Sequence, residues 1–155
     1  MTARTYTDGL TMIASHFQDR QRNSTSNHRV KAALRLRTDG GAKLILRPSF
    51  MFGRSIHGQS LRYEFWWKNP DKGWMIRRGI IGTASHYALH DSENFKSIRE
   101  TLREFADNPA KVLRRSSDSC AICDRRLTDP VSQARGVGPE CMKHVAWFVK
   151  EVGQC

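Results

Sequence analysis

The sequence contains no long apolar run. No stretch approaches the roughly 18 consecutive apolar residues that a membrane-spanning helix needs. The segment from Met1 to Phe17 also lacks the continuous apolar region of a signal peptide. We therefore expect a cytoplasmic protein, in a reducing compartment, with no membrane partner.

Sequence motifs of catalysis are missing as well. The chain has no glycine-rich phosphate loop with a lysine, no dinucleotide fingerprint and no His-Glu-x-x-His pair. Its carboxylates, among them Glu64, Asp71 and Asp91, lack the close pairing that metal nucleases use. His86 and His90 have metal-like spacing, but no third ligand follows at a useful distance. These absences predict a protein that is not an enzyme and has no small-molecule substrate; an unrecognised nuclease-type activity is the enzymatic alternative.

Acidic side chains are too few to balance the basic ones. The 155 residues include 26 Lys and Arg against 15 Asp and Glu, which gives a formal net charge of +11. The excess is spread along the chain, and its larger part precedes residue 110. A field of this sign favours encounter with nucleic acid or another acidic partner. The alternative is a basic surface that serves solubility alone.

Cysteine occurs only four times, and three of the four stand in a metal-type pattern. Cys120 and Cys123 are three positions apart, and Cys141 and His144 repeat that spacing after seventeen residues, directly behind a Gly-Pro pair. Proline suits the first turn of a helix, and positions i and i+3 share a helix face, so the thiolate and the imidazole are expected to converge. Such ligands select Zn²⁺. We predict one structural zinc ion in a treble-clef-like finger, with His144 preferred over Cys155 as the fourth ligand.

The stretch from Cys120 to Cys141 also resembles a family of small zinc-finger domains of unknown function. It reads C-x2-C-x-R-x-L-T-D-P-x-S-x2-R-G-x-G-P-x-C. The resemblance implies the three cysteine ligands and leaves the fourth open, so His144 rests on spacing alone. Such domains are common in phages and actinobacterial genomes, alone or appended to helicase-like proteins. The resemblance implies a phage or mobile-element protein acting near nucleic acid, and no particular activity.

Periodicity predicts an α+β domain before the finger. A first helix is expected from apolar residues at helical spacing (Leu10, Ile13, Ala14 and Phe17), with Thr7 or Asp8 as its N-cap and His16 at the surface or boundary. Alternating side chains predict strands at 31–37, 43–47, 61–67 and 74–81, which form two hairpins. A second helix follows Asp91 or Ser92, ends at Asn108-Pro109, and leads into a short basic connector at 111–117.

The predicted fold is therefore an antiparallel four-stranded sheet of two hairpins flanked by two helices, followed by the zinc finger. We place the basic α+β domain at residues 1–115 and the finger at 116–155. The pairing between the two hairpins cannot be derived from the pattern.

Nine residues are candidates for nucleic-acid contact. Arg35 and Arg37 lie on the polar face of the first hairpin, which is either only solvated or binds a row of backbone phosphates. Trp66 is either a stacking residue with Arg62 nearby or part of a second small core. The rest belong to the connector and the finger. The full set is Arg35, Arg37, Arg62, Trp66, Arg114, Arg115, Arg125, Arg126 and Arg135.

Two functional hypotheses follow. The first is a small, basic, zinc-binding accessory protein, encoded by a phage and active in the cytoplasm of its host, that binds DNA or RNA through backbone contacts. The second is a protein-binding adaptor or inhibitor that docks an acidic host protein, as in host takeover.

Overall fold

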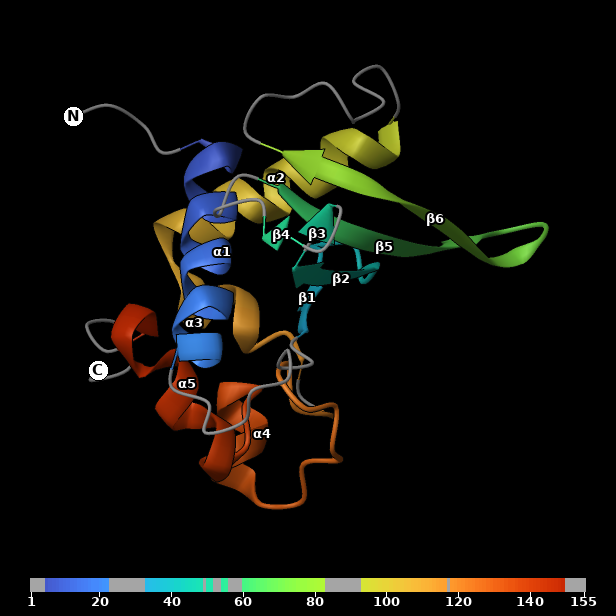
Figure 1. Cartoon of the computed structure of the whole chain (residues 1–155). Coiled ribbons are helices and arrows are strands. Elements are labelled where there is room, and N and C mark those ends of the chain that lie inside the picture. Colours follow the sequence, from blue (N-terminus) through green and yellow to red (C-terminus); the bar gives the residue numbers. More distant parts are fainter. Residues whose placement is uncertain are drawn as a thin grey trace.

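The computed structural model describes residues 5–22, 33–48, 50–51, 54–55, 60–82, 93–116 and 118–149. These residues form a four-stranded antiparallel sheet, a layer of helices and a smaller C-terminal part at one end of the molecule (Figure 1). The α+β class is thereby confirmed. The elements are α1 (Tyr6–Arg22), β1 (Leu34–Arg37), β2 (Lys43–Pro48), β3 (Phe50–Met51), β4 (Arg54–Ser55), β5 (Ser60–Asn69), β6 (Gly73–Gly82), α2 (Glu93–Asp107), α3 (Pro109–Leu113), α4 (Pro130–Arg135) and α5 (Pro139–Val149).

The sheet has the order β1-β2-β5-β6, and every neighbouring pair is antiparallel. Both predicted hairpins are present, and the pairing between them joins β2 to β5, with Lys43 opposite Trp66 and Pro48 opposite Leu61. The short strands β3 and β4 pair with each other as a separate ribbon. The long β5–β6 hairpin is closed at its tip by Gly73, whose φ of 77° suits glycine.

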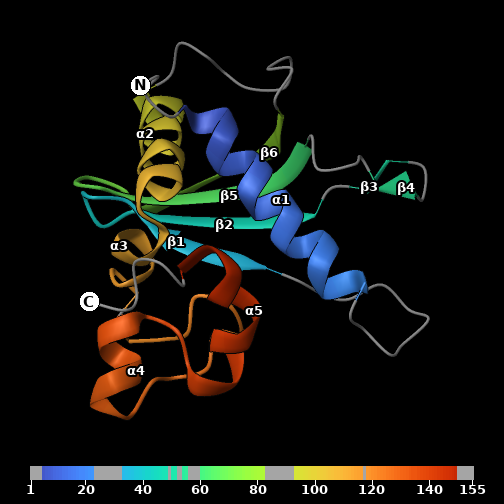
Figure 2. The ribbon, with the colours of Figure 1, turned by 90° about the vertical axis from the view of Figure 1, so that its left-hand side faces the viewer.

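Helices α1 and α2 cover one face of the sheet (Figure 2). Alternate residues of the strands point toward them and are buried, as period-two alternation requires; they include Leu34, Leu36, Leu44, Leu46, Leu61, Tyr63, Phe65 and Ile81. The two helices touch closely where Gly9 meets the backbone of Leu102, since a Cβ on Gly9 would lie 2.2 Å from the Leu102 carbonyl oxygen. The other sheet face carries no described helix.

The core continues into the C-terminal part, residues 118–149, which we call the finger. Its buried residues Cys120, Ile122, Leu127, Val137 and Val145 belong to one cluster with the apolar residues of the sheet and of α1 and α2. The finger is therefore packed onto the rest of the protein. The division of the chain after residue 115 stays a prediction.

Local structure differs from the sequence-based expectation at several helix ends. Helix α1 begins earlier than predicted, and the carboxylate of Asp8 accepts a hydrogen bond from the backbone N–H of Thr5 (2.8 Å), so Thr5 is the residue before the helix. Helix α3, predicted as connector, has Asn108 as its N-cap and Pro109 in its first turn. The residues 31–32, Asp91 and Ser92 lie outside the described part of the chain, as do His86 and His90.

His16 is a second correction. It is fully buried rather than at the surface, and its Nδ1 lies 3.0 Å from the backbone oxygen of His144. A carbonyl oxygen only accepts, so Nδ1 donates this hydrogen bond and joins α1 to α5. The helical stripe alone could not reveal this, because the partner lies 128 positions away.

Candidate metal centre and basic sheet face

Three of the predicted metal ligands come together in the finger. The Sγ atoms of Cys120, Cys123 and Cys141 all lie within 4.8 Å of one another, and the three cysteines are free thiols. Cys120 and Cys123 sit on a tight turn, while Cys141 lies in the first turn of α5, directly after Pro139. A group of this size and chemistry can hold a metal ion.

Two backbone N–H groups, one from the tight turn and one from the residue before α5, point at the sulfur of Cys120. The N–H groups of Ile122 and Gly138 each donate to Cys120 Sγ at 3.4 Å. The turn closes when the N–H of Asp124 bonds to the carbonyl oxygen of Cys120 (2.9 Å), and Asp124 adopts a positive φ of 64°. Such N–H donors stabilise a thiolate, which is the protonation state that a metal requires.

The environments of the thiols differ. Burial raises the pKa of Cys120, but hydrogen bonds led by the Gly138 N–H outweigh it and leave the pKa below its ordinary value. Burial, followed by repulsion from the Cys120 thiolate, raises the pKa of Cys141 to about 12. Three thiols this close cannot all ionise without a cation between them. The donor set therefore fits a bound metal ion.

His144 is not part of this group. Among the described residues, the set of mutually close ligand atoms contains three cysteines and no fourth member. Three residues along α5 rise about 4.5 Å, so a shared helix face does not by itself bring the imidazole to the sulfur of Cys141. Cys155 lies outside the described residues. The identity of the fourth ligand stays a prediction.

Two arginines join the edge strand of the sheet to its surroundings, one to the finger and one to the chain after α3. Arg35 on β1 donates from Nη1 to the carbonyl oxygen of Ile122 (2.8 Å), and its Nε lies 3.8 Å from the carboxylate of Asp124. Its backbone N–H also donates to the carbonyl oxygen of Ala121 (2.8 Å). The turn that carries two of the cysteines is thus held against β1 by main chain and side chain together.

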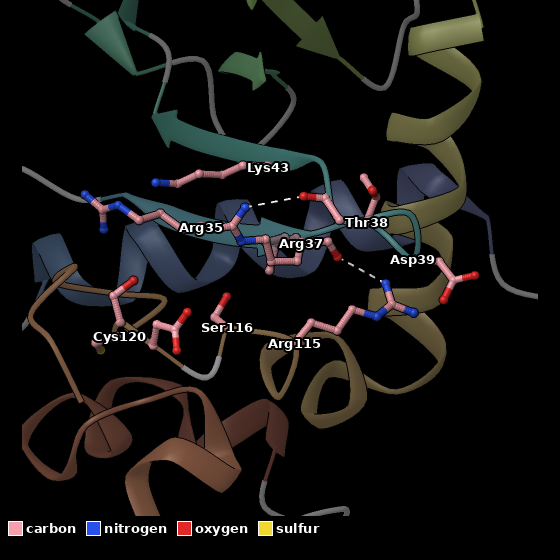
Figure 3. A pocket seen from close by; sticks show the side chains of 12 residues that line it. Arg35, Arg37, Thr38, Asp39, Lys43, Arg115, Ser116 and Cys120 are labelled. Carbon is pink, nitrogen blue, oxygen red and sulfur yellow. Dashed lines mark hydrogen bonds between the residues drawn. The ribbon is translucent and has the colours of Figure 1, made fainter. Parts of the chain in front are cut away.

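The second tie is Arg115, which follows α3. Its Nη1 donates to the carbonyl oxygen of Arg37 (3.1 Å; Figure 3). Its Nη2 pairs with the carboxylate of Glu104 on α2. The side chains of Arg35 and Arg115 are each only 17% exposed. Both residues were predicted as nucleic-acid contacts, but the structure shows their side chains engaged with the protein itself.

A pocket of about 430 Å³ lies at this junction between sheet and finger (Figure 3). We call it the junction pocket. It is lined by strand β1, the turn after it and the chain leading to Cys120, and includes the side chains of Arg37 and Lys43 together with the carboxylates of Asp39 and Asp118. Its other cationic side chains are Lys43 and Arg37, and the Nη1 of Arg37 donates to the carbonyl oxygen of Gly41 (3.4 Å).

The sheet face opposite the helices, which we call the outer face, is strongly basic. The register places alternate residues of all four strands on it, and these include seven basic residues and one acidic residue. The basic residues are Arg35, Arg37, Lys43, Arg47, Arg62, Lys68 and Arg78. The predicted contacts Arg35, Arg37, Arg62 and Trp66 lie on this face. Lys43 and Arg47 were not predicted, although their alternation with buried leucines is a signal that places them here.

The one acidic residue of the outer face is already neutralised. The carboxylate of Glu64 lies 3.2 Å from Arg47 and 3.8 Å from Arg78, and it also accepts a hydrogen bond from the indole N–H of Trp66 (3.1 Å). With Arg62, these two arginines line a hollow of about 410 Å³. We call it the arginine hollow.

Two tryptophans extend the outer face. Trp66 on β5 and Trp74 on β6 line a further pocket of about 410 Å³ together with Arg37, Lys43 and Ile45. We call it the tryptophan slot. The side chain of Trp74 is 55% exposed, which is unusual for so large an apolar group in the described part of the chain. Trp74 was not among the predicted nucleic-acid contacts, although its position opposite Lys68 follows from the hairpin turn.

The other predicted contacts lie outside the outer face. Arg114, Arg125, Arg126 and Arg135 are exposed, the last at the end of α4. Helix α4 was not predicted from the sequence; it begins after Asp129, whose carboxylate accepts a hydrogen bond from the Ser132 N–H (3.0 Å).

None of the described helices combines the length and apolar character of a membrane span. Comparison with curated proteins and with solved structures gives no match. Residues 114–146, about a fifth of the chain, match the family of unknown function DUF6011, and this match contains all three clustered cysteines.

Proposed function

We propose that this protein is a small zinc-binding accessory protein that binds nucleic acid through the outer face of its sheet. The observation that carries the proposal is the distribution of charge on that face. Seven basic residues stand there against the single carboxylate of Glu64, which is itself paired with two arginines. A surface on which basic groups so far outnumber acidic ones attracts a polyanion, because binding releases condensed counterions from the phosphates.

The binding surface that we propose differs from the set expected from sequence. It leaves out Arg35, whose guanidinium group holds the finger, and Arg115, whose guanidinium group binds β1 and α2. It adds Lys43, Arg47, Lys68 and Arg78, which the register places on the outer face. Secondary phosphate contacts in this proposal come from the exposed Arg114, which precedes the finger, and from the exposed finger residues Arg125, Arg126 and Arg135.

For the metal we propose zinc in a structural role. Thiolates are preferred zinc ligands, and a small finger lacks the buried area to fold without a metal. Cys120, Cys123 and Cys141 would hold the ion, with His144 or Cys155 as the fourth ligand. Zinc supplies charge neutralisation for the clustered thiolates, and the tight turn and α5 supply their orientation.

The biological setting that we propose is a phage or mobile element, with the protein acting in the cytoplasm of a host cell. This rests on the resemblance of the finger to small phage-associated zinc domains. We propose no catalytic role.

The salt dependence of binding tests the proposal. Fluorescence anisotropy with labelled DNA and RNA, across a salt series, should show affinity that falls steeply with salt. The double variant Arg62→Gln/Lys68→Gln should reduce the slope of log affinity against log salt by up to about 1.4–1.8, roughly 0.7–0.9 per contact removed.

A matched control removes two charges from the opposite layer. Lys96 and Arg103 on α2 are both exposed, so Lys96→Gln/Arg103→Gln changes net charge equally while leaving the outer face intact. Equal effects of the two double variants would refute a localised site. No binding of either nucleic acid at low salt, with nuclease-insensitive capture of one stoichiometric protein, would replace the proposal with a host-protein adaptor.

Elemental analysis tests the metal separately. We expect one zinc per chain in the purified protein, and loss of zinc in Cys141→Ser. Zinc-free protein, or disulfides among the three clustered cysteines, would contradict the structural role.

A further inference from the structure

We propose that the outer face takes single-stranded nucleic acid, with one unpaired base seated in the tryptophan slot. This inference rests on the proposed function and adds the class of nucleic acid and the group that is recognised. The slot combines two indole rings, from Trp66 and Trp74, with the cationic side chains of Arg37 and Lys43. A nucleotide presents a complementary pair of groups, a flat base that can stack on an indole and an anionic phosphate that can pair with a cation.

The register fixes how these groups are arranged. Arg37, Lys43 and Trp66 are successive cross-strand partners, so they form one row across β1, β2 and β5. Neighbouring strands lie about 4.8 Å apart, which places the Cα atoms of Arg37 and Trp66 roughly 10 Å apart. One end of the slot is therefore aromatic and the other cationic, with Ile45, also on this face, among its lining residues.

The two tryptophans are held differently. The indole N–H of Trp66 donates to Glu64 at 3.1 Å, which fixes the orientation of that ring within the sheet face. Trp74 is 55% exposed near the tip of the long hairpin. An exposed indole beside a fixed one forms a platform on which a base can stack, and stacking tolerates any base because every base has a π face.

The arrangement favours a single strand over a duplex. In a duplex the faces of the bases are covered by their neighbours, so no base could stack on the indole rings and the slot would stay unused. The slot also shares Arg37 and Lys43 with the junction pocket, and the arginine hollow lies on the same face. A flexible strand can place phosphates in these flanking sites while one base enters the slot.

The test compares oligonucleotides that differ only in their bases. Anisotropy is measured with oligothymidylate, oligouridylate and an abasic phosphodeoxyribose strand, each of about 12 nucleotides, and with a duplex of that length. The full-length zinc-loaded protein and its Trp74→Ala variant are compared. Val131→Ala serves as the matched control, because Val131 on α4 is 56% exposed but lies off the sheet.

We expect the wild-type protein to bind at least one base-bearing single strand more tightly than the abasic strand. Trp74→Ala should weaken that binding roughly 5- to 150-fold. It should leave affinity for the abasic strand and the duplex unchanged, which also shows that the variant is folded. Val131→Ala should retain the preference for bases.

Different failures have different meanings. Equal affinity for base-bearing and abasic strands, unaffected by Trp74→Ala, overturns the slot while the proposed backbone binding stands. Absence of binding to every oligonucleotide overturns the proposed function as well. Unchanged oligonucleotide affinities, with loss of a nuclease-insensitive protein partner in Trp74→Ala, would assign the slot to a protein instead.

Discussion

Replacing Arg35 by methionine tests whether this arginine holds the finger against the sheet. Methionine keeps an unbranched apolar stem but removes the donor to the Ile122 carbonyl oxygen. That hydrogen bond is 2.8 Å long, and the Arg35 side chain is only 17% exposed. A hydrogen bond to a charged group contributes about 1.5–3 kcal/mol. Its loss should therefore lower the free energy of unfolding by about that amount.

The ion pair with Asp124 should add little to this figure. Its atoms are 3.8 Å apart and the Asp124 side chain is 49% exposed, so we expect less than about 1 kcal/mol from it. Asp124→Asn removes the charge alone. Because asparagine also tolerates the positive φ of 64° at this position, Asp124→Asn should be close to neutral.

The free energy of unfolding is measured by urea unfolding and the melting temperature by thermal unfolding. Zinc is held in fixed excess in both, because a bound metal shifts apparent stability. The melting temperature of a chain of this size changes by about 2–4 °C per kcal/mol, so Arg35→Met should melt about 3–12 °C lower. Arg125→Gln, an exposed change on the same loop, is the control. If Arg35→Met stays within about 0.5 kcal/mol of wild type, the tie carries no stability and the reasoning is refuted.

Three further changes probe other parts of the account. Glu64→Gln keeps the acceptor for the tryptophan indole but frees its two arginine partners, so nucleic-acid affinity measured by anisotropy should rise; a fall would contradict the charge analysis. Gly136→Ala should lower the free energy of unfolding by more than about 1 kcal/mol, because φ is 74° and a Cβ would lie 1.8 Å from the Leu113 carbonyl oxygen. Gly41→Ala is the control, since Gly41 has a φ of 88° but open space around it, and its loss of stability should be smaller. Equal losses of stability in the two variants would exclude the steric contribution. Hydrogen bonds from the first turn of α4 lower the pKa of Asp129 from its ordinary value of 3.8. The ionised carboxylate therefore stabilises the helix start at neutral pH, and this stabilisation is lost as pH falls through the lowered pKa. An NMR titration midpoint for Asp129 at or above 3.8 would contradict its role as the N-cap.

The sheet was largely predictable because its residues alternate. Leu34 and Leu36, with the leucines of the next strand, share a face in any antiparallel hairpin, and the glycine turns fixed where each hairpin bends. The β2–β5 pairing was not predictable, since no turn joins those strands directly. Helices α3 and α4 were missed although Asn108-Pro109 and Asp129-Pro130 are both N-cap signals; a proline after a helix was interpreted only as an interruption.

In the candidate site, too, local features were predictable from the sequence and contacts between distant residues were not. The cysteine spacing predicted the three clustered thiols, because both knuckle and helix start are local features. The roles of Arg35 and Arg115 could not be derived from sequence, since their partners lie 87 and 78 positions away. Charge alone cannot distinguish an arginine that binds phosphate from one that binds a carbonyl oxygen of its own chain.

The position of the nucleic-acid site is tested most directly by the indole N–H signals of the tryptophans in a two-dimensional NMR spectrum. Trp66 and Trp74 lie on the outer face, whereas Trp67 packs against the core and stacks on Phe65 at 5.7 Å. On titration with oligothymidylate, the indole signals of Trp66 and Trp74 should shift while that of Trp67 stays in place. Saturable binding that moves neither sheet-face signal would contradict the assignment of this face.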